Sequence, residues 1–323
     1  MLNRRTILSG LALAPVAHLA LAQGTYPDRP IKMVVGFTPG GGADVIARVM
    51  GPYLAKELGQ AIVIENKPGV GGNVAAQYLA AAKPDGYTLM MGTIAALAIN
   101  PALYKDRLGF DPDKDFAAIT NAVDSSNVLV VPTQSKLMDV QQVIEAAKTG
   151  TLSYGSSGIG TAGHLAGEMF AMLTGTKILH VPYKSGGSLM TAILGGEVDI
   201  SFSSGVTAVP QIQGGKLRAL GVTTMKRSAT LPSVPTIAEA GVKGFVSNNW
   251  YGLVAPAATP KTVIDKLNAA CVKVLSDPEV VSKLLAQAFD PSPMTPQEFA
   301  AFMRSERTKW ARVVKDAEIK VDS

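Results

Sequence analysis

The sequence has 323 residues, of which 47% are hydrophobic, so it is long enough and apolar enough for about two globular domains with packed cores. Its net charge is only +5, and acidic residues are interspersed in and around its densest basic stretch, 304–315, which predicts a solvated helix face and no nucleic-acid surface. The single cysteine, Cys271, excludes an internal disulfide, and the spacing of the His, Cys, Asp and Glu residues predicts neither a metal site nor a cofactor.

The first predicted element is an export signal over residues 1–22. A basic start at Arg4-Arg5 precedes an apolar stretch, and Ala20-Leu21-Ala22 has the small-residue pattern of a cleavage site. The paired arginines leave two export routes open, the general secretory (Sec) route and the twin-arginine route. No later stretch contains the roughly 20 apolar residues that a membrane-spanning helix needs. We therefore expect cleavage after Ala22 and a location outside the cytoplasm.

The next segments alternate between strand-like and helix-like patterns. Strands are expected over 31–37, 62–65 and 87–91, with a helix over 45–58 and another ending at residue 81 between them. Repeated β–α winding of this kind predicts a parallel sheet with helices on both faces.

The first strand and helix flank a glycine-rich loop, Phe37-Thr38-Pro39-Gly40-Gly41-Gly42-Ala43-Asp44. Its three successive glycines let backbone N–H groups approach a ligand closely, and the first turn of the helix adds partial positive charge. The loop lacks the Lys-Ser/Thr ending of a P-loop, so it suits a small anion better than a nucleoside triphosphate with magnesium. Asp44 is open to two roles, a cap that holds the loop and a contact to the ligand through water.

A second set of segments follows, and the chain then returns to the first set. Strands are expected at 128–131, 152–154, 178–181, 198–202 and 217–223, and helices at 140–148, 161–173, 189–194, 260–275, 278–288 and 296–317. The return lies near residue 248. This order predicts two α/β domains, residues 23–124 with 248–323 and residues 125–247, with a ligand cleft between them.

The second domain contains its own candidate anion site, the loop 155–161, which again lies between a strand and a helix. The hydroxyls of Ser156, Ser157 and Thr161 can donate to carboxylate oxygens or cap the helix. A third loop, 183–188, leads into another helix. Ligands of open α/β sheets bind at the carboxyl ends of the strands, where all three loops are expected. Each loop taken alone also fits an ordinary turn with a Ser or Thr cap.

Two rival functions have partial support in the sequence. Residues 158–163 match the G-x-G-x-x-G pattern of dinucleotide sites, but the preceding strand is short, the next strand lacks the expected acid, and the export signal argues against a free nicotinamide cofactor. An exported hydrolase would need His164 as its general base, with Glu168 one helical turn away. No G-x-S-x-G elbow is present, and helix packing explains His164 equally well. We therefore expect no enzymatic activity.

The order and spacing of several short motifs resemble the Bug family, the TctC-like extracytoplasmic solute-binding proteins of tripartite tricarboxylate transporters. The resemblance covers essentially the whole mature chain. Besides the loop 37–44, the motifs are Tyr26–Ile31, Val63–Gly69, Pro84–Leu89, Ala98–Tyr104, Tyr154–Gly158, His164–Glu168, His180–Lys184 and Leu194–Asp199.

This resemblance implies a two-domain Venus-flytrap, type II-like periplasmic-binding-protein fold that closes over a small mono- or dicarboxylate. It further implies a periplasmic monomer whose partners are membrane permease subunits, or a membrane receptor if the protein is a ligand sensor. The third loop departs from the family pattern at Ser185 and at Ser188-Leu189. The residues predicted to bind ligand are Phe37, Thr38, Pro39, Gly40, Gly41, Gly42, Ala43, Asp44, Thr93, Ser156, Ser157, Gly158, Gly160, Thr161, His164, Tyr183, Lys184 and Ser185.

Overall fold

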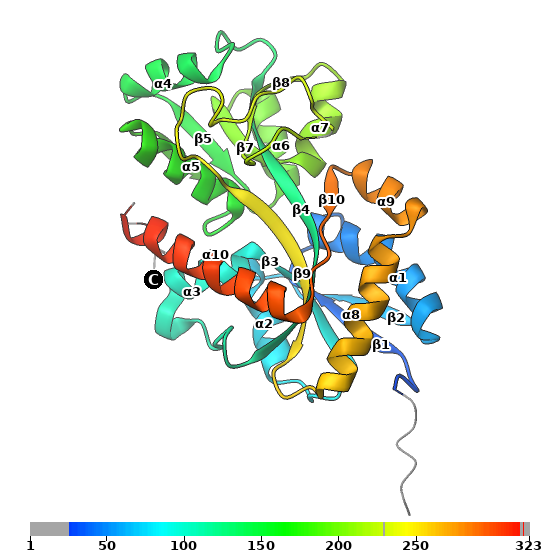
Figure 1. Ribbon diagram of the computed structural model, residues 1–323. Coiled ribbons are helices and arrows are strands. Elements are labelled where there is room, and N and C mark those ends of the chain that lie inside the picture. Colours follow the sequence, from blue (N-terminus) through cyan, green and yellow to red (C-terminus); the bar gives the residue numbers. More distant parts are fainter. Residues whose placement is uncertain (1–25, 229, 317–318, 320–323) are drawn as a thin grey trace, which may run out of the picture.

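The computed structural model describes residues 26–228, 230–316 and 319, so the predicted export signal lies outside the described residues. The described chain forms two lobes, and two long strands pass between them (Figure 1). None of the described helices is long and apolar enough to cross a membrane.

The lower lobe in Figure 1 is built from the two ends of the described chain. Its N-terminal elements are β1 (Ile31–Val35), α1 (Gly42–Leu58), β2 (Ile62–Asn66), η1 (Val70–Gly72), α2 (Asn73–Ala80), β3 (Thr88–Thr93), η2 (Ala95–Ile99), α3 (Asn100–Tyr104) and η3 (Lys105–Arg107). Its C-terminal elements are α8 (Lys261–Leu275), α9 (Pro278–Leu285), β10 (Phe289–Pro291) and α10 (Pro296–Asp316). Helix α1 begins at Gly42, three residues earlier than expected, so that the glycine-rich loop leads directly into its first turn.

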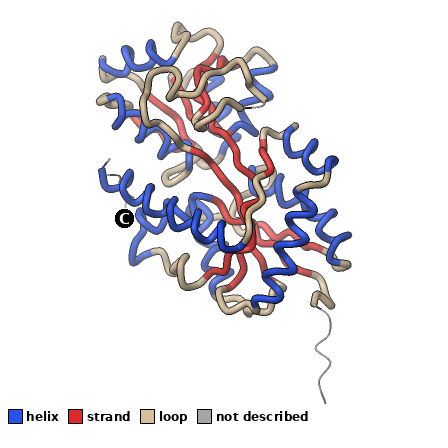
Figure 2. Tube along the Cα trace, in the orientation of Figure 1, coloured by secondary structure: helices blue, strands red, loops and turns tan. Residues whose placement is uncertain are grey.

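The upper lobe holds the middle of the chain. Its elements are α4 (Val140–Lys148), β5 (Ser153–Ser156), α5 (Ala162–Thr174), β6 (Leu179–Pro182), α6 (Gly186–Gly195), β7 (Ile200–Ser204), α7 (Gly205–Gln213) and β8 (Leu217–Val222). The two strands that connect the lobes are β4 (Phe116–Pro132) and β9 (Asn248–Pro256). Figure 2 shows the helices surrounding the strands of each lobe, which is the layered arrangement expected of an α/β protein.

The parallel pairing expected of the first three strands is confirmed, but the sheet as a whole is mixed. Its strand order is β2-β1-β3-β9-β4-β7-β5-β6, with β8 and β10 also pairing with β4. Strand β1 pairs in parallel with β2 and β3, and β5 pairs in parallel with β6 and β7. Within the described chain, β4 and β9 pair only in the antiparallel direction. The β–α winding is therefore confined to each lobe, and the strands that join the lobes run against their neighbours.

Strand β4 changes partners along its length. It pairs with β9 from Phe116 to Ser126 and with β7 from Asn127 to Val130. The change places Asn127 where the chain passes from one lobe to the other, with its backbone N–H donating to Thr223 Oγ1 at 3.0 Å.

Helix α10 holds β9 in place through a buried aromatic contact. Trp250 is fully buried and packs edge-on against Phe299 and Phe302, with ring centroids 5.7 and 5.4 Å away. The indole N–H groups of Trp250 and Trp310 both donate to Glu306 Oε2 at 3.1 Å. This carboxylate satisfies two buried donors at once, which fixes the part of β9 that faces the space between the lobes.

Candidate functional site

A cavity of about 520 Å³ lies between the two lobes. Its walls are the loops that follow β1, β2, β3, β5 and β6, together with the first turns of α1, α5 and α6. Further lining residues come from β4, β7 and β9, from the start of α7 and from the end of α3. Among the described residues that line it, Lys184 is the only charged side chain. The size suits a small molecule. Because the described lining is uncharged apart from Lys184, an anion here would be held mainly by hydrogen-bond donors and helix ends.

The structure brings together residues from all three predicted loops. Those that line the cavity are Phe37, Thr38, Gly41, Gly42, Ala43, Thr93, Ser157, Gly158, Thr161, Tyr183, Lys184 and Ser185. The predicted residues that do not line it are Pro39, Gly40, Asp44, Ser156, Gly160 and His164.

The first loop, residues 37–44, presents the N-terminal end of α1 to the cavity. Gly41 occupies the N-cap position and provides no capping side chain, so the first-turn N–H groups of α1 have no side-chain acceptor from the cap. Gly40 has φ +83°, a conformation that favours glycine, and the Gly41 N–H donates to Thr38 O at 3.2 Å. The loop therefore offers backbone donors and the positive end of a helix dipole to an anion.

Asp44 stabilises this loop from a position outside the cavity lining. Its Oδ2 accepts from the Gly40 N–H and from Arg48 Nε, and its Oδ1 accepts from Asn66 Nδ2, each at 2.9 Å. Asn66 Nδ2 also donates to Phe37 O at 3.0 Å. Burial works to raise the pKa of Asp44, but the hydrogen bonds from Arg48, Gly40 and Asn66 outweigh it, so the pKa lies below its usual value. The ionised carboxylate stabilises the conformation of the loop through these hydrogen bonds, and it does not line the cavity.

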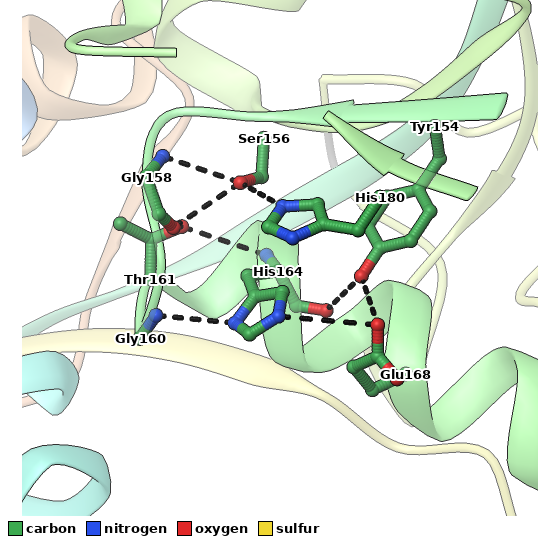
Figure 3. A network of polar contacts seen from close by, with 8 residues as sticks. All are labelled: Tyr154, Ser156, Gly158, Gly160, Thr161, His164, Glu168 and His180. Atoms are coloured by element: carbon green, nitrogen blue, oxygen red, sulfur yellow. Dashed lines mark hydrogen bonds and ion pairs between the residues drawn. The ribbon is translucent and has the colours of Figure 1, made fainter. Parts of the chain in front are cut away.

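The second loop, residues 155–161, is held by hydrogen bonds among its own hydroxyl and backbone groups (Figure 3). Thr161 Oγ1 donates to Gly158 O at 2.7 Å, and the Gly158 N–H donates to Ser156 Oγ at 3.2 Å. Thr161 also caps α5 by accepting from the His164 N–H at 3.5 Å. Of the three hydroxyls predicted to meet ligand, those of Ser156 and Thr161 are thus used within the loop, and Ser157 lines the cavity.

Two stacked histidines lie behind this loop (Figure 3). The His164 and His180 rings are 4.1 Å apart, His164 Nδ1 accepts from the Gly160 N–H at 3.1 Å, and His180 Nε2 lies 2.7 Å from Ser156 Oγ. Burial and the nearby His180 lower the pKa of His164 to about 3, and burial lowers the pKa of His180 to about 4. Both rings are therefore neutral at physiological pH, and His164 Nδ1 is already occupied by the loop backbone.

Tyr154 and Glu168 complete this cluster. The Tyr154 hydroxyl donates to Glu168 Oε1 at 2.5 Å, and its ring stacks on His180 at 4.8 Å. Burial and the Glu168 charge raise the pKa of Tyr154 well above its usual value, so it stays a donor. The cluster positions the loop, and none of its four side chains lines the cavity.

The serines at the third loop form a helix cap. Ser185 Oγ accepts from the Ser188 N–H at 3.2 Å, and Ser188 Oγ accepts from the Ser185 N–H at 3.1 Å, which together make a capping box for α6. These are positions at which the chain departs from the family pattern. Ser185 lines the cavity even so, next to Lys184, whose side chain is exposed.

Two groups stand out among the cavity residues that sequence reasoning missed. The loop 68–71 lines the cavity, although none of its residues is among those predicted to bind ligand. Its glycine-rich pattern between a strand and a helix matches the first loop and was the available signal. Asn127, Asn249 and Tyr251 also line the cavity from the connecting strands. No motif in the sequence marks these three residues.

Comparisons with known proteins agree on the family. The family model described as "Tripartite tricarboxylate transporter family receptor" matches residues 46–319. Protein BugT of Bordetella pertussis is 32% identical to this chain, and the alignment covers 99% of each. The UPF0065 protein in the tcbD-tcbE intergenic region of Pseudomonas sp. strain P51 is 35% identical, over 97% of this chain and 94% of that protein.

Solved structures agree on the fold. R. palustris Rpa4515, determined with adipate, is 34% identical, has a TM-score of 0.86, and is matched over 91% of this chain and 99% of its own. MatC from Rhodopseudomonas palustris, determined with bound malate, is 32% identical, with a TM-score of 0.82 and coverage of 90% and 100%. The periplasmic binding protein BugD is 33% identical, with a TM-score of 0.83 and coverage of 91% and 99%. The family resemblance and the periplasmic-binding-protein fold expected from the sequence are thus confirmed, and the chain belongs to the tripartite tricarboxylate transporter family receptors, the TctC or Bug family of solute-binding proteins.

Proposed function

We propose that this protein is a periplasmic solute-binding protein that captures a small mono- or dicarboxylate between its lobes and presents it to the permease subunits of a tripartite tricarboxylate-type transporter. The observation that carries the proposal is the cavity itself. Glycine-rich loops from both lobes meet there, one of them at the uncapped N-terminus of α1, and no acidic side chain lines it among the described residues. The relatives determined with adipate and malate support the ligand class.

The binding step follows from this arrangement. Backbone N–H groups and the helix end of the first loop stabilise one face of a carboxylate, and the second loop contacts it from the other lobe. A ligand that contacts both lobes stabilises the closed state, in which the lobes are together, relative to an open state in which they are apart. The permease subunits would then recognise the closed, loaded form.

The location and domain limits belong to the same proposal. Export through the Sec or twin-arginine route with cleavage after Ala22 would deliver the protein to the periplasm, where its relatives are described as working. The proposed domains are residues 23–124 with 248–323 and residues 125–247. The change of β4 partners at Asn127 supports a boundary near residue 125. The protein is proposed to act as a monomer.

A hydrolytic function has weaker support. The Ser156 Oγ to His180 Nε2 distance of 2.7 Å is that of a nucleophile and its base. Ser156 is fully buried, however, and neither residue lines the cavity. The relatives that belong to the same family are substrate-binding proteins, which supports the binding function.

A thermal-shift screen of small carboxylates tests the proposed function. A ligand present at 100 times its dissociation constant is expected to raise the free energy of unfolding by about 2.7 kcal/mol, because it binds only the folded protein. The panel should contain malate, adipate, amino acids and aromatic carboxylates, with uncharged amides of the same size as controls. The proposal predicts that at least one carboxylate raises the melting temperature and that its amide does not. Equal shifts for acids and amides, or no shift for any acid, would refute it.

A further inference from the structure

We propose that Asn127 determines ligand specificity by donating a hydrogen bond to a second oxygen acceptor on the ligand, so that the site prefers dicarboxylates to monocarboxylates of the same length. The inference rests on the proposed function and adds to it a contact outside the loops that hold the first carboxylate.

Asn127 belongs to the part of the cavity lining that comes from the connecting strands. We call this part, formed by Asn127, Asn249 and Tyr251, the floor of the cavity. Asn127 is 1% exposed, lines the cavity, and sits on β4 where that strand changes partners. Its backbone is fully engaged, because its N–H donates to Thr223 Oγ1 and its C=O accepts from the Thr223 N–H, both at 3.0 Å. The main chain of Asn127 is therefore fixed, so the position of its Cβ atom at the cavity is fixed as well.

The amide of that side chain lacks a partner. Asn127 Nδ2 is buried and has no hydrogen-bond partner among the described residues. A buried donor without an acceptor costs free energy comparable to a lost hydrogen bond, about 1–3 kcal/mol, so native structures leave few of them. A donor in this state at a ligand cavity is explained if the ligand supplies the acceptor.

The side chains next to Asn127 also favour an oxygen acceptor on the ligand, because they are neutral hydrogen-bond donors. Asn249 and Tyr251 line the same floor, and Asn249 Nδ2 donates to Tyr251 Oη at 3.1 Å. Burial raises the pKa of Tyr251, so its hydroxyl keeps its proton and remains able to donate. The floor thus adds neutral donors to those of the loops, and no carboxylate lies among the described lining residues to repel a second anionic group. A ligand with carboxylates at both ends matches donors at both the loops and the floor.

The test compares pairs of ligands that differ only at one end. Adipate is paired with hexanoate and malate with 3-hydroxybutyrate, and each is titrated calorimetrically into the wild-type protein and the Asn127→Leu variant. Wild type should bind the dicarboxylate of at least one pair more tightly than its partner. Loss of a hydrogen bond to a charged group should reduce that preference by about 10- to 100-fold in Asn127→Leu.

Stability without ligand separates a ligand-directed role from a structural one. Leucine has the same branching of side-chain heavy atoms as asparagine, and its extra volume can extend into the cavity. Because it also removes an unpartnered donor, Asn127→Leu should be at least as stable as wild type in the absence of ligand. The matched control is Asn121→Leu, on the same strand. Asn121 is fully buried, lies outside the cavity, and donates to Asp124 Oδ1 at 3.1 Å. That control should lose stability and keep the ligand preference.

The outcomes distinguish a failure of the proposed function from a failure of the proposed role of Asn127. If the wild type binds none of the four acids or any other carboxylate, the proposed function fails and the role of Asn127 falls with it. If the wild type binds but shows no preference within either pair, or if Asn127→Leu keeps the preference, only the role of Asn127 is overturned. Asn127→Asp provides a second variant, since its added negative charge should reverse the preference in favour of the monocarboxylate.

Discussion

At Gly42, the first residue of α1, the backbone has no room for a side chain. A Cβ atom built there would lie 2.5 Å from Tyr251 Oη and 3.0 Å from Tyr251 Cζ. Tyr251 cannot yield easily, because its ring packs edge-on against Phe289 at 5.7 Å and its hydroxyl accepts from Asn249. The glycine therefore lets the N-terminus of the helix meet the floor of the cavity.

The Gly42→Ala variant should lose affinity for the carboxylate found in the screen by about tenfold or more, equivalent to about 1.4 kcal/mol. The added methyl group displaces Tyr251 or the start of α1, and overpacking of this kind costs about 1–3 kcal/mol of stability. Calorimetric titration measures the affinity. Gly195→Ala is the control, because a Cβ there meets nothing within 4 Å. Equal affinity in Gly42→Ala and wild type would show that the helix end does not form the site.

Asp44 shows what could not be decided from residue type alone. The sequence left it two roles, a cap for the loop and a water-mediated ligand contact. Its three donors, from Gly40, Arg48 and Asn66, lie up to 22 positions from Asp44 in the chain, and only the folded structure brings all of them together. The same applies to Asn127, whose importance comes from a missing partner and so has no sequence motif.

At the scale of single elements, α5 and β6 hold the second loop in place, because each contributes one histidine of a neutral, stacked pair that contacts the loop. His164 comes from α5 and His180 from β6, and each ring touches the loop, at Gly160 and at Ser156. Because both folded pKa values lie below the ordinary value near 6.5, the unfolded chain binds more protons than the folded protein between about pH 6.5 and pH 4. The stability that depends on neutral His164 and His180 is therefore fully present above about pH 6.5 and is lost as the pH falls.

The His180→Gln variant should be less sensitive to acid than the wild type. A difference of one bound proton changes the free energy of unfolding by about 1.4 kcal/mol per pH unit, so the stability gap between the two proteins should narrow by about 1 kcal/mol from pH 6 to pH 5. Denaturant unfolding at several pH values measures the gap. A gap that stays constant, or that widens toward acid, would mean that His180 is not held neutral in the folded protein.

The loops and the long strands differ in how well the sequence reveals them. The β–α–β pattern and the glycine-rich turns predict each lobe and the first two loops, because local periodicity and turn chemistry are visible in a single sequence. Strand β4 was expected only at 128–131 and in fact begins at Phe116. It is buried along almost its whole length, so it shows no alternation, and its Thr120, Asn121 and Asn127 interrupt the apolar run. Helix α7, which begins at Gly205 and contains Pro210, was missed because both residues disfavour helices.

At the scale of the whole molecule, the lobes touch beside the cavity. A Cβ added to Gly160 of the second loop would lie 2.8 Å from Asn100 Oδ1 and 3.0 Å from Leu103 Cδ1, both in the other lobe. Tyr104, the last residue of the same helix, lines the cavity. The lobes are therefore close enough for one small ligand to contact loops from both. The two-lobed fold followed from the order of elements and the family resemblance, whereas this contact depends on the relative placement of segments about 60 residues apart in the chain.

A crystal structure of the protein with the carboxylate identified in the screen tests the central claim most directly. The predicted result is a single ligand in the cavity, with one carboxylate within about 3.2 Å of donors from both the first loop, 37–44, and the second loop, 155–161. A ligand bound elsewhere, or one that contacts the loop of a single lobe, would contradict a site formed by the two lobes together.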